Sequence, residues 1–257
     1  MVASSQAAQL ILLETDYYRG TINRFAPDGT WRIFATGLIY PIGVACDSEG
    51  NLFAADSTGT IYKFTAHGTR STFASGLNNP FALAFDSADN LFEADQGSGS
   101  IYKFTPDGTR STFASGLSSP YGLAFDGAGN LFETDEGSSS INKFTPDGTR
   151  STFATGLDYP YGLACDRAGN VFESDFLSDT IYKFTPDGRR STFATGLDRP
   201  IGLAFDQAGN LFEVDQYSHS ILKFAPDGTR STFAFGIGSG GEMLAFRHHL
   251  RQFDGSP

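Results

Sequence analysis

A repeat of 40 residues runs through almost the whole chain and limits the folds it can adopt. The segment 101–140 recurs from residues 61, 141, 181 and 221, and a copy that is one residue shorter begins at Ile22. Units of this length bury their apolar face only by stacking on their neighbours, so a repeat of this period indicates an array or a closed ring. The units are close copies, because only 12 of 40 positions differ between 101–140 and 141–180.

Each unit contains four short runs with turn residues between them. In one unit they cover residues 120–125, 130–135, 141–145 and 150–154, and they are rich in Phe, Tyr, Leu and Thr. Such residues favour strands, and each run has the length of an ordinary strand. Asp, Gly and Pro between the runs are typical of tight turns. Four antiparallel strands in about 40 residues predict one blade of a β-propeller.

Counting the runs predicts six blades in one domain. The third run begins six times, at Ile22, Ile61, Ile101, Ile141, Ile181 and Ile221. The first run begins only five times, at a proline, and its sixth copy is expected at Met243–Phe246. The second run of the first blade begins near Leu10, so the two ends of the chain are expected to pair and to close the ring, which removes exposed sheet edges. The predicted fold is an all-β, six-bladed propeller whose blades cover 9–36 with 242–247, 41–76, 80–116, 120–156, 160–196 and 200–236.

Charge and composition exclude several classes of protein. The net charge is −11 and the pI is near 4.7, which argues against binding to a nucleic-acid backbone. The longest aliphatic run, Leu10–Leu13, is too short to cross a membrane, and no secretory leader is expected in this sequence. Cys46 and Cys165 fall in opposite blades and are therefore expected to be unpaired. We expect a monomer that binds neither nucleic acid nor membranes.

Variation between the units is concentrated on one face. The loops between the second and third runs and the connectors between units lie at one end of the blades, called here the top face, and the remaining turns lie on the bottom face. On the top face, aromatic and charged residues gather in blades 5, 6 and 1 and their neighbours. These residues predict a patch for a small molecule or a protein segment; they are Tyr17, Tyr18, Arg19, Tyr40, Tyr159, Tyr161, Phe176, Asp179, Arg199 and Tyr217. The alternative is relaxed constraint on exposed loops.

Two sets of carboxylates recur in the second run of the blades. An aspartate ends this run in every blade, and we expect it to bond the backbone of the following loop rather than a metal. A glutamate precedes it by two residues in five blades, and pairing across the loop would place it opposite a basic residue. The expected ion pairs are Glu14–Arg24, Glu93–Lys103, Glu133–Lys143, Glu173–Lys183 and Glu213–Lys223. Blade 2 has Ala54 instead, which leaves Lys63 either as a site lysine or as an ordinary surface lysine.

The repeat pattern is P-x-G-L-A-x-D-x-x-G-N-L-F-x-x-D followed by I-x-K-F. It resembles the NHL repeat, and it is similar to the wider set of six-bladed propellers that includes the gluconolactonase family and the streptogramin lyases. Relatives of this kind are often bacterial and exported, so the resemblance implies a periplasmic or extracellular protein.

The metal site of the gluconolactonase family does not transfer to this sequence. In that family, Glu, Asn and Asp precede the Gly of P-x-G, whereas five of the six positions here are Ile42, Phe81, Tyr121, Tyr161 and Ile201. The sixth is Glu242, and one carboxylate is too few for a cation that prefers several oxygen ligands. No cofactor is therefore expected, and a divalent cation near Glu242 is expected only if the protein is an enzyme.

Few residues offer catalytic chemistry. Glu242 at an apolar channel mouth could serve as an acid or base, and His219 in the blade 6 loop is a second candidate. Glu242 is also compatible with a solvated residue of a Gly-rich segment. His67 replaces the aspartate of a bottom turn and is interpreted as a surface variant.

Three hypotheses follow from these observations. The first is a binding module that presents its top face to a small ligand or a protein segment. The second is a lactonase-like hydrolase or lyase that uses Glu242 with His219, Asp179 or Arg19. The third is a consensus-like scaffold without an evolved ligand. A channel filled by Tyr121 and Tyr161 would favour the first and third hypotheses over the enzyme.

Overall fold

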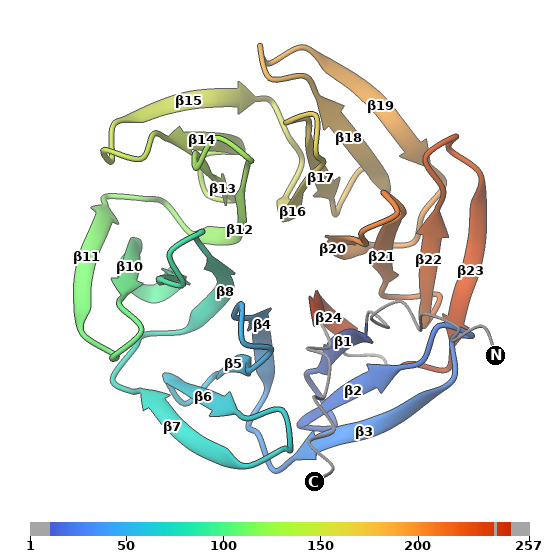
Figure 1. Ribbon diagram of the computed structural model, residues 1–257. Helices are drawn as coiled ribbons and strands as arrows, with labels where there is room; N and C mark the ends of the chain where they lie inside the picture. The colour runs from blue at the N-terminus through green and yellow to red at the C-terminus, as the bar shows by residue number, and fades with distance from the viewer. Residues whose placement is uncertain (1–10, 239–240, 248–257) are drawn as a thin grey trace, which may run out of the picture.

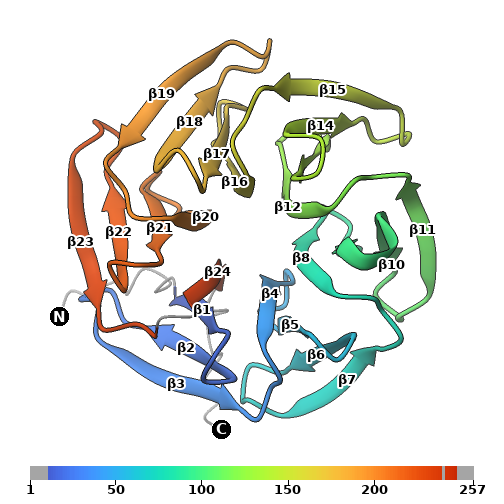
Figure 2. The same ribbon diagram turned by 180° about the vertical axis from the view of Figure 1, so that it is seen from behind.

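The chain forms six four-stranded antiparallel sheets that are arranged as blades around a central axis (Figure 1). This computed structural model describes residues 11–238 and 241–247. The view from the opposite face shows the same ring, with the innermost strand of each blade next to the axis (Figure 2). The predicted six-bladed propeller is therefore confirmed.

Each strand position in the blade is filled once per blade. The innermost strands are β24 (Gly241–Arg247), β4 (Pro41–Cys46), β8 (Pro80–Phe85), β12 (Pro120–Phe125), β16 (Pro160–Cys165) and β20 (Pro200–Phe205). The second strands are β1 (Ile11–Asp16), β5 (Leu52–Asp56), β9 (Leu91–Asp95), β13 (Leu131–Asp135), β17 (Val171–Asp175) and β21 (Leu211–Asp215). The third strands are β2 (Thr21–Phe25), β6 (Thr60–Phe64), β10 (Ser100–Phe104), β14 (Ser140–Phe144), β18 (Thr180–Phe184) and β22 (Ser220–Phe224). The outermost strands are β3 (Trp31–Thr36), β7 (Arg70–Ala74), β11 (Arg110–Ser115), β15 (Arg150–Thr155), β19 (Arg190–Thr195) and β23 (Arg230–Phe235).

The ring closes because β24 pairs with β1, so the first blade combines both ends of the chain. Asp16 lies opposite Gly241 and Glu14 lies opposite Leu244 in this pair. The same register places Met243 where four of the other blades have the Gly of P-x-G and blade 3 has Ala82. The Met243 N–H donates to Thr15 Oγ1 at 3.2 Å, just as the Gly122 N–H donates to Thr134 Oγ1 in blade 4. The predicted closure is confirmed; Leu10 lies outside the described residues.

Phenylalanines from neighbouring blades lock the ring together. In β9 the Phe92 ring meets Phe113 of its own blade and Phe125 of the next blade, with ring centroids 5.0 Å apart in both contacts. The same edge-to-face geometry recurs for Phe53 and Phe172. Aromatic pairs at this distance stabilise a core beyond the area that they bury. The repeated phenylalanines of the sequence therefore form the joints between blades.

Among the described residues, no Glu–Lys ion pair joins a second strand to a third strand, and the pairing register explains why. Asp135 lies opposite Ser140 rather than Ile141, so Glu133 lies opposite Asn142 and Lys143 lies opposite Phe132. A shift of one residue places the Glu and Lys side chains on opposite faces of the blade. The same register holds for the glutamates of blades 1, 3, 5 and 6.

The lysines instead lie over phenylalanine rings. Each Lys Nζ is 5.1–5.5 Å from the centroid of the Phe that faces it, a distance at which a cation is attracted to the ring. Lys63 is 3.6 Å from the carboxylate of Asp47, so the lysine of blade 2 has an acidic partner at the bottom face.

The five glutamates are fully buried between the strands. Burial raises the pKa of Glu133 to about 8, although the Asn142 amide that donates to Glu133 Oε2 at 2.8 Å acts in the opposite direction. Burial likewise raises the pKa values of Glu93, Glu173 and Glu213 well above their usual range, and a neighbouring aspartate adds to each shift. The carboxyls of Glu93, Glu133, Glu173 and Glu213 are therefore neutral in the folded protein at neutral pH. This lowers the stability of the fold at any pH at which the same carboxyls ionise in the unfolded chain.

We expect the substitution Glu133→Gln to stabilise the fold in a pH-dependent way. Below pH 4.5 the carboxyl is neutral in both the folded and unfolded states, so the isosteric amide should change little. Between pH 4.5 and about 8 only the unfolded state ionises, so wild-type stability falls as the pH rises. The variant should gain on the order of 2 kcal/mol at pH 7. Urea unfolding at pH 4.5, 6 and 8 measures the difference. The exposed Glu49→Gln provides the control, and an equal effect at all three pH values would contradict the burial argument.

Candidate functional site

The aspartates that end the second strands hold the top-face loops in place. In blade 4 one Asp135 oxygen accepts the Ser138 N–H at 3.1 Å and the other accepts the Ser118 N–H at 2.8 Å. Asp95, Asp175 and Asp215 repeat both bonds in their own blades. The predicted bond from aspartate to loop is confirmed, and a second bond to the connector accompanies it. Each aspartate thereby ties a loop and a connector to one rigid strand.

The connector residue before each proline has a left-handed backbone. Its φ lies between 50° and 94° at Tyr40, Asn79, Ser119, Tyr159 and Arg199. This conformation is uncommon for residues other than Gly. In blade 4 it is held by hydrogen bonds on both sides, because Asp135 accepts the N–H of the preceding Ser118 and the Ser119 carbonyl accepts the Glu136 N–H at 3.0 Å. The side chain at this position varies while the backbone does not. The repeat therefore presents a different residue at one constant place in each blade.

The structure brings six predicted patch residues together over blades 5 and 6. The Tyr159 and Tyr161 rings pack against Phe176, with centroids 5.5 and 6.0 Å away. The Arg199 guanidinium lies 4.8 Å from the Phe176 centroid and 5.9 Å from that of Tyr217. Asp179 accepts the backbone N–H of Arg199 at 3.1 Å. We call these residues the blade 5–6 patch; they are Tyr159, Tyr161, Phe176, Asp179, Arg199 and Tyr217.

Arg199 is the charged group of this patch. Its side chain is half-buried between the two aromatic rings, and its Nη1 is buried with no hydrogen-bond partner in the part of the chain that the structure describes. Leaving a buried donor of a charged group unpaired is unfavourable, and a ligand oxygen would relieve that cost. Tyr217 and Leu177 beside it are 60% and 45% exposed, so apolar surface is available next to the charge.

Aromatic rings fill the top of the central channel. Phe81, Tyr121 and Tyr161 come from three successive blades, and each ring contacts the other two with centroids 4.1–5.4 Å apart. The Tyr121 hydroxyl is 3.1 Å from that of Tyr159 and accepts the Gln96 amide at 3.2 Å. The channel mouth therefore continues into the blade 5–6 patch as one aromatic wall.

The remaining patch residues form a separate group on blades 1 and 2. The Tyr17 ring stacks on Tyr40 at 4.7 Å and meets the edge of Tyr18 at 5.2 Å. Arg19 is 3.4 Å from the carboxylate of Asp16 and is exposed. The single patch predicted from the sequence is thus divided into two clusters, and only the blade 5–6 patch combines an aromatic wall with a cation that lacks a partner among the described residues.

The two candidate catalytic residues are placed differently. His219 is exposed at a left-handed position of its loop, with φ of 53°. Glu242 lies in β24 one residue before Met243, so the register places its backbone level with that of Ile42, Tyr121 and the other channel residues. The structure does not describe the Glu242 side chain.

The residues at the channel do not fit a bound metal ion. Five of the six equivalent positions hold buried Ile, Phe or Tyr side chains, which supply no carboxylate or carbonyl oxygen toward a cation. Within residues 11–238 and 241–247, no group of three or more His, Cys, Asp or Glu side chains is arranged to hold a metal. A calcium or zinc centre would need several such ligands.

Sequence reasoning missed the role of Gln96. It lies in a loop that looked featureless, yet its amide contacts both the Ser119 hydroxyl and the Tyr121 hydroxyl at the channel mouth. The one signal in the sequence was that blade 3 has the neutral amide of Gln96 where the next blade has the carboxylate of Glu136. That difference alone does not reveal the contact.

Among the described residues, cavities open on the bottom face between three pairs of blades. Their volumes are about 370 Å³ between blades 5 and 6, 390 Å³ between blades 3 and 4, and 530 Å³ between blades 1 and 2. The first two are equivalent by the repeat, since each is lined by the same turns and by a Lys over a Phe ring. The third differs in its lining.

Comparison with solved structures supports the fold. The chain is similar to a propeller in the crystal structure of a nidogen/laminin complex, with 22% identity, a TM-score of 0.84 and coverage of 93% of this chain and 98% of that one. It is also similar to a gluconolactonase from Xanthomonas campestris, with 22% identity, a TM-score of 0.73 and coverage of 82% and 84%. A catalytically inactive virginiamycin B lyase from Staphylococcus aureus with quinupristin matches at 14% identity, with a TM-score of 0.71 and coverage of 93% and 88%.

These similarities define the chain as a six-bladed propeller of the architecture shared by binding proteins and by lactonases and lyases. No family model matches the sequence. No curated protein matches it either. In the described part of the chain, no helix is long and apolar enough to span a membrane.

The cysteines are free, as the sequence predicted. Burial raises the pKa of the Cys165 thiol to about 12, and the nearby Asp126 and Asp166 add to the shift. Because the thiolate is the nucleophile, Cys165 should be inert at neutral pH.

We expect Cys165 to react with a thiol reagent such as DTNB at least tenfold more slowly than free cysteine at pH 8, and to react fully after unfolding in urea. The variant Cys46→Ser isolates the Cys165 signal. Rapid reaction of Cys165 in the folded variant would contradict the assigned burial.

Proposed function

We propose that this protein is a binding module whose top face takes a ligand or protein segment with a carboxylate next to an apolar or aromatic group. The observation that carries the proposal is Arg199, a guanidinium held between Phe176 and Tyr217 with one nitrogen buried and unpartnered among the described residues. A guanidinium binds a carboxylate through paired hydrogen bonds, and stacking on rings keeps it in place.

The surroundings of Arg199 support an apolar group beside that carboxylate. Tyr159, Tyr161 and Phe176 form a continuous wall, and Tyr217 and Leu177 expose apolar surface at its edge. Ligand sites combine such walls with a few polar groups that fix orientation. The aromatic rings that fill the channel mouth favour binding at the surface over chemistry inside the channel. The neighbour from the nidogen/laminin complex supports the view that a propeller of this shape can serve protein recognition.

We expect Arg199→Asn to abolish this binding without loss of fold. Asparagine occupies the same left-handed position in blade 3, at Asn79, so the backbone should be kept. The probe is 3-phenylpropanoate, compared with its neutral amide by isothermal titration calorimetry. The wild-type protein should prefer the acid, and the variant should bind it at least tenfold more weakly, because a charge-assisted hydrogen bond is worth about 1.5–3 kcal/mol.

The control moves the charge instead of removing it. In the double variant Arg199→Asn with Asn79→Arg, the net charge is unchanged while the arginine leaves its aromatic surroundings. Binding should remain lost. Equal affinity for acid and amide in the wild type, or recovery in the double variant, would overturn the assignment and leave a scaffold without a ligand at this face.

A lactonase-like hydrolase or lyase is the second candidate, and the register of β24 is the observation that favours it. It places a carboxylate residue, Glu242, level with the ring of channel residues. A stoichiometric divalent cation in the purified protein that disappears in Glu242→Ala would support this candidate, and metal analysis by mass spectrometry measures it.

A further inference from the structure

The cavity between blades 1 and 2 on the bottom face differs from its equivalents in charge. Elsewhere the third strand has a lysine opposite a serine, as in the pairs Lys63–Ser71, Lys103–Ser111, Lys143–Ser151, Lys183–Ser191 and Lys223–Ser231. In blade 1 the pair is Arg24 opposite Arg32. Two like charges directly opposite on neighbouring strands destabilise a sheet. The two side chains are exposed, and an anion bound between them would relieve this repulsion.

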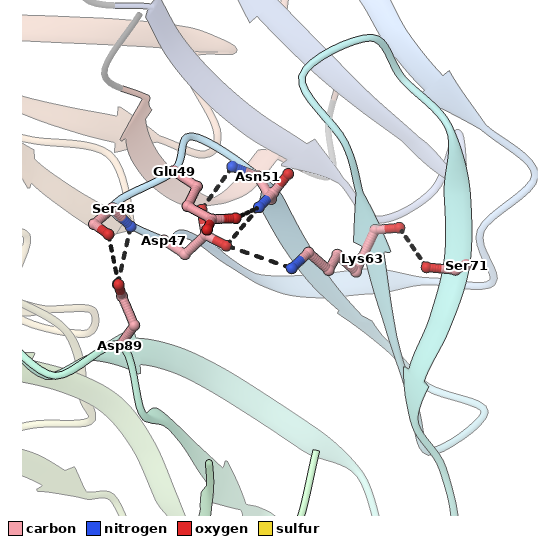
Figure 3. Close-up of polar contacts among 7 residues, drawn as sticks. All are labelled: Asp47, Ser48, Glu49, Asn51, Lys63, Ser71 and Asp89. Atoms are coloured by element: carbon pink, nitrogen blue, oxygen red, sulfur yellow. Dashed lines mark hydrogen bonds and ion pairs between the residues drawn. The ribbon is translucent and has the colours of Figure 1, made fainter. Parts of the chain in front are cut away.

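In two blades a bottom-face aspartate pairs with the basic residue of the third strand. Figure 3 shows this arrangement in blade 2, where Lys63 Nζ lies 3.6 Å from Asp47. Lys103 has the same partner in blade 3, Asp86, at 3.8 Å. In the sequence, the residue that follows the innermost-strand Phe or Cys is Asp in five blades, but it is Arg247 after Phe246 in blade 1. Blade 1 thus lacks the aspartate that neutralises its neighbours.

A second residue that replaces a negative charge of the other blades lies on the blade 2 side of the cavity. The bottom turn of that blade reads Thr-Ala-His-Gly, where five other blades have Pro-Asp-Gly, so His67 replaces an aspartate. His67 lines the 530 Å³ cavity together with Arg24 and Arg32. Among the described residues, neither arginine has an ion pair. The aspartate of the adjoining turn, Asp28, is engaged by the Thr30 N–H and hydroxyl at 3.0 and 2.7 Å.

Most of the other residues that line the cavity are apolar. Phe25, Phe34 and Ile33 line it, and Ile33 is 55% exposed. The volume falls within the range of small-molecule sites. In a protein with net charge −11, a cavity with two arginines and a histidine is a local reversal of sign. Paired guanidinium groups match the geometry of a tetrahedral oxyanion.

We propose that this cavity is a second binding site, distinct from the top face, for a phosphate monoester of a small apolar alcohol. Arg24 and Arg32 would hold the phosphate from one wall, with His67 across from them, and the apolar residues would hold the ester group. This site contains no residue of the blade 5–6 patch. The proposed anion site and the proposed top-face site can therefore be tested independently.

The test uses phenyl phosphate, inorganic phosphate and phenol as probes in isothermal titration calorimetry at low ionic strength. We expect phenyl phosphate to bind at least tenfold more tightly than inorganic phosphate and phenol not to saturate. Arg32→Ser installs the residue that the other five blades have, so the fold should be kept, and it should weaken phenyl phosphate binding about tenfold or more. His67→Asp restores the common turn residue and should weaken binding as well.

The matched control is Arg189→Ser, which removes one positive charge from an exposed bottom turn of another blade. Its affinity for phenyl phosphate should equal that of the wild type. Circular dichroism would be used to check that each variant is folded. If phenyl phosphate does not bind, binds no better than inorganic phosphate, or binds equally to Arg32→Ser, the proposed site is wrong.

Discussion

The aspartate at the end of each second strand is the interaction on which the rest of the top face depends. Its two oxygens bind a loop and a connector at once, so both are fixed to a buried strand by charge-assisted hydrogen bonds. A loop that is held by its backbone can accept almost any side chain. The left-handed residue before the proline shows this, because it is Tyr, Asn, Ser, Tyr and Arg in successive blades at nearly one backbone geometry. In this fold, backbone hydrogen bonds to the aspartates hold the loops in place, and the side chains of the loops are free to vary.

The buried glutamates show the opposite use of acidic residues. They lie two residues before the supporting aspartates and are fully buried, and for Glu93 and Glu213 no hydrogen-bond partner is found among the described residues. Blade 2 has Ala54 at the same position and keeps its four strands, so the carboxyl is not required for the blade to form. The Phe joints between blades supply packing that offsets the cost of a neutral carboxyl at Glu93, Glu133, Glu173 and Glu213. The glutamates are therefore a tolerated feature of the repeat rather than its basis.

The sequence was sufficient to predict the blades and their closure, because repeated Phe, Pro and Asp-Gly signals mark every strand and turn. It was insufficient for the register across the loops. The loop from Asp135 has four residues rather than five, so Asp135 lies opposite Ser140, and that difference of one residue moved Glu133 away from Lys143. Hairpin register depends on loop conformation, which the short polar loops do not reveal. The division of the top patch was equally hidden, since it depends on which neighbouring rings meet across blades.

Near-identical repeats also provide an internal reference for function. A residue that is the same in every unit is explained by its role in the blade. A residue that differs in one unit needs an explanation specific to that unit. The exchange of Phe for Cys46 in blade 2 and for Cys165 in blade 5 leaves a half-buried, free thiol at an otherwise unchanged strand end. The departures at the cavity between blades 1 and 2 are different, because Arg32 of blade 1 and His67 of blade 2 come from separate segments and both line one cavity beside Arg24, which keeps the positive charge of the lysine in the other blades. Independent drift would not favour one sign of charge at one place, particularly where the chain as a whole is acidic. The convergence of these exchanges, rather than any one of them, distinguishes a binding site from a variable surface.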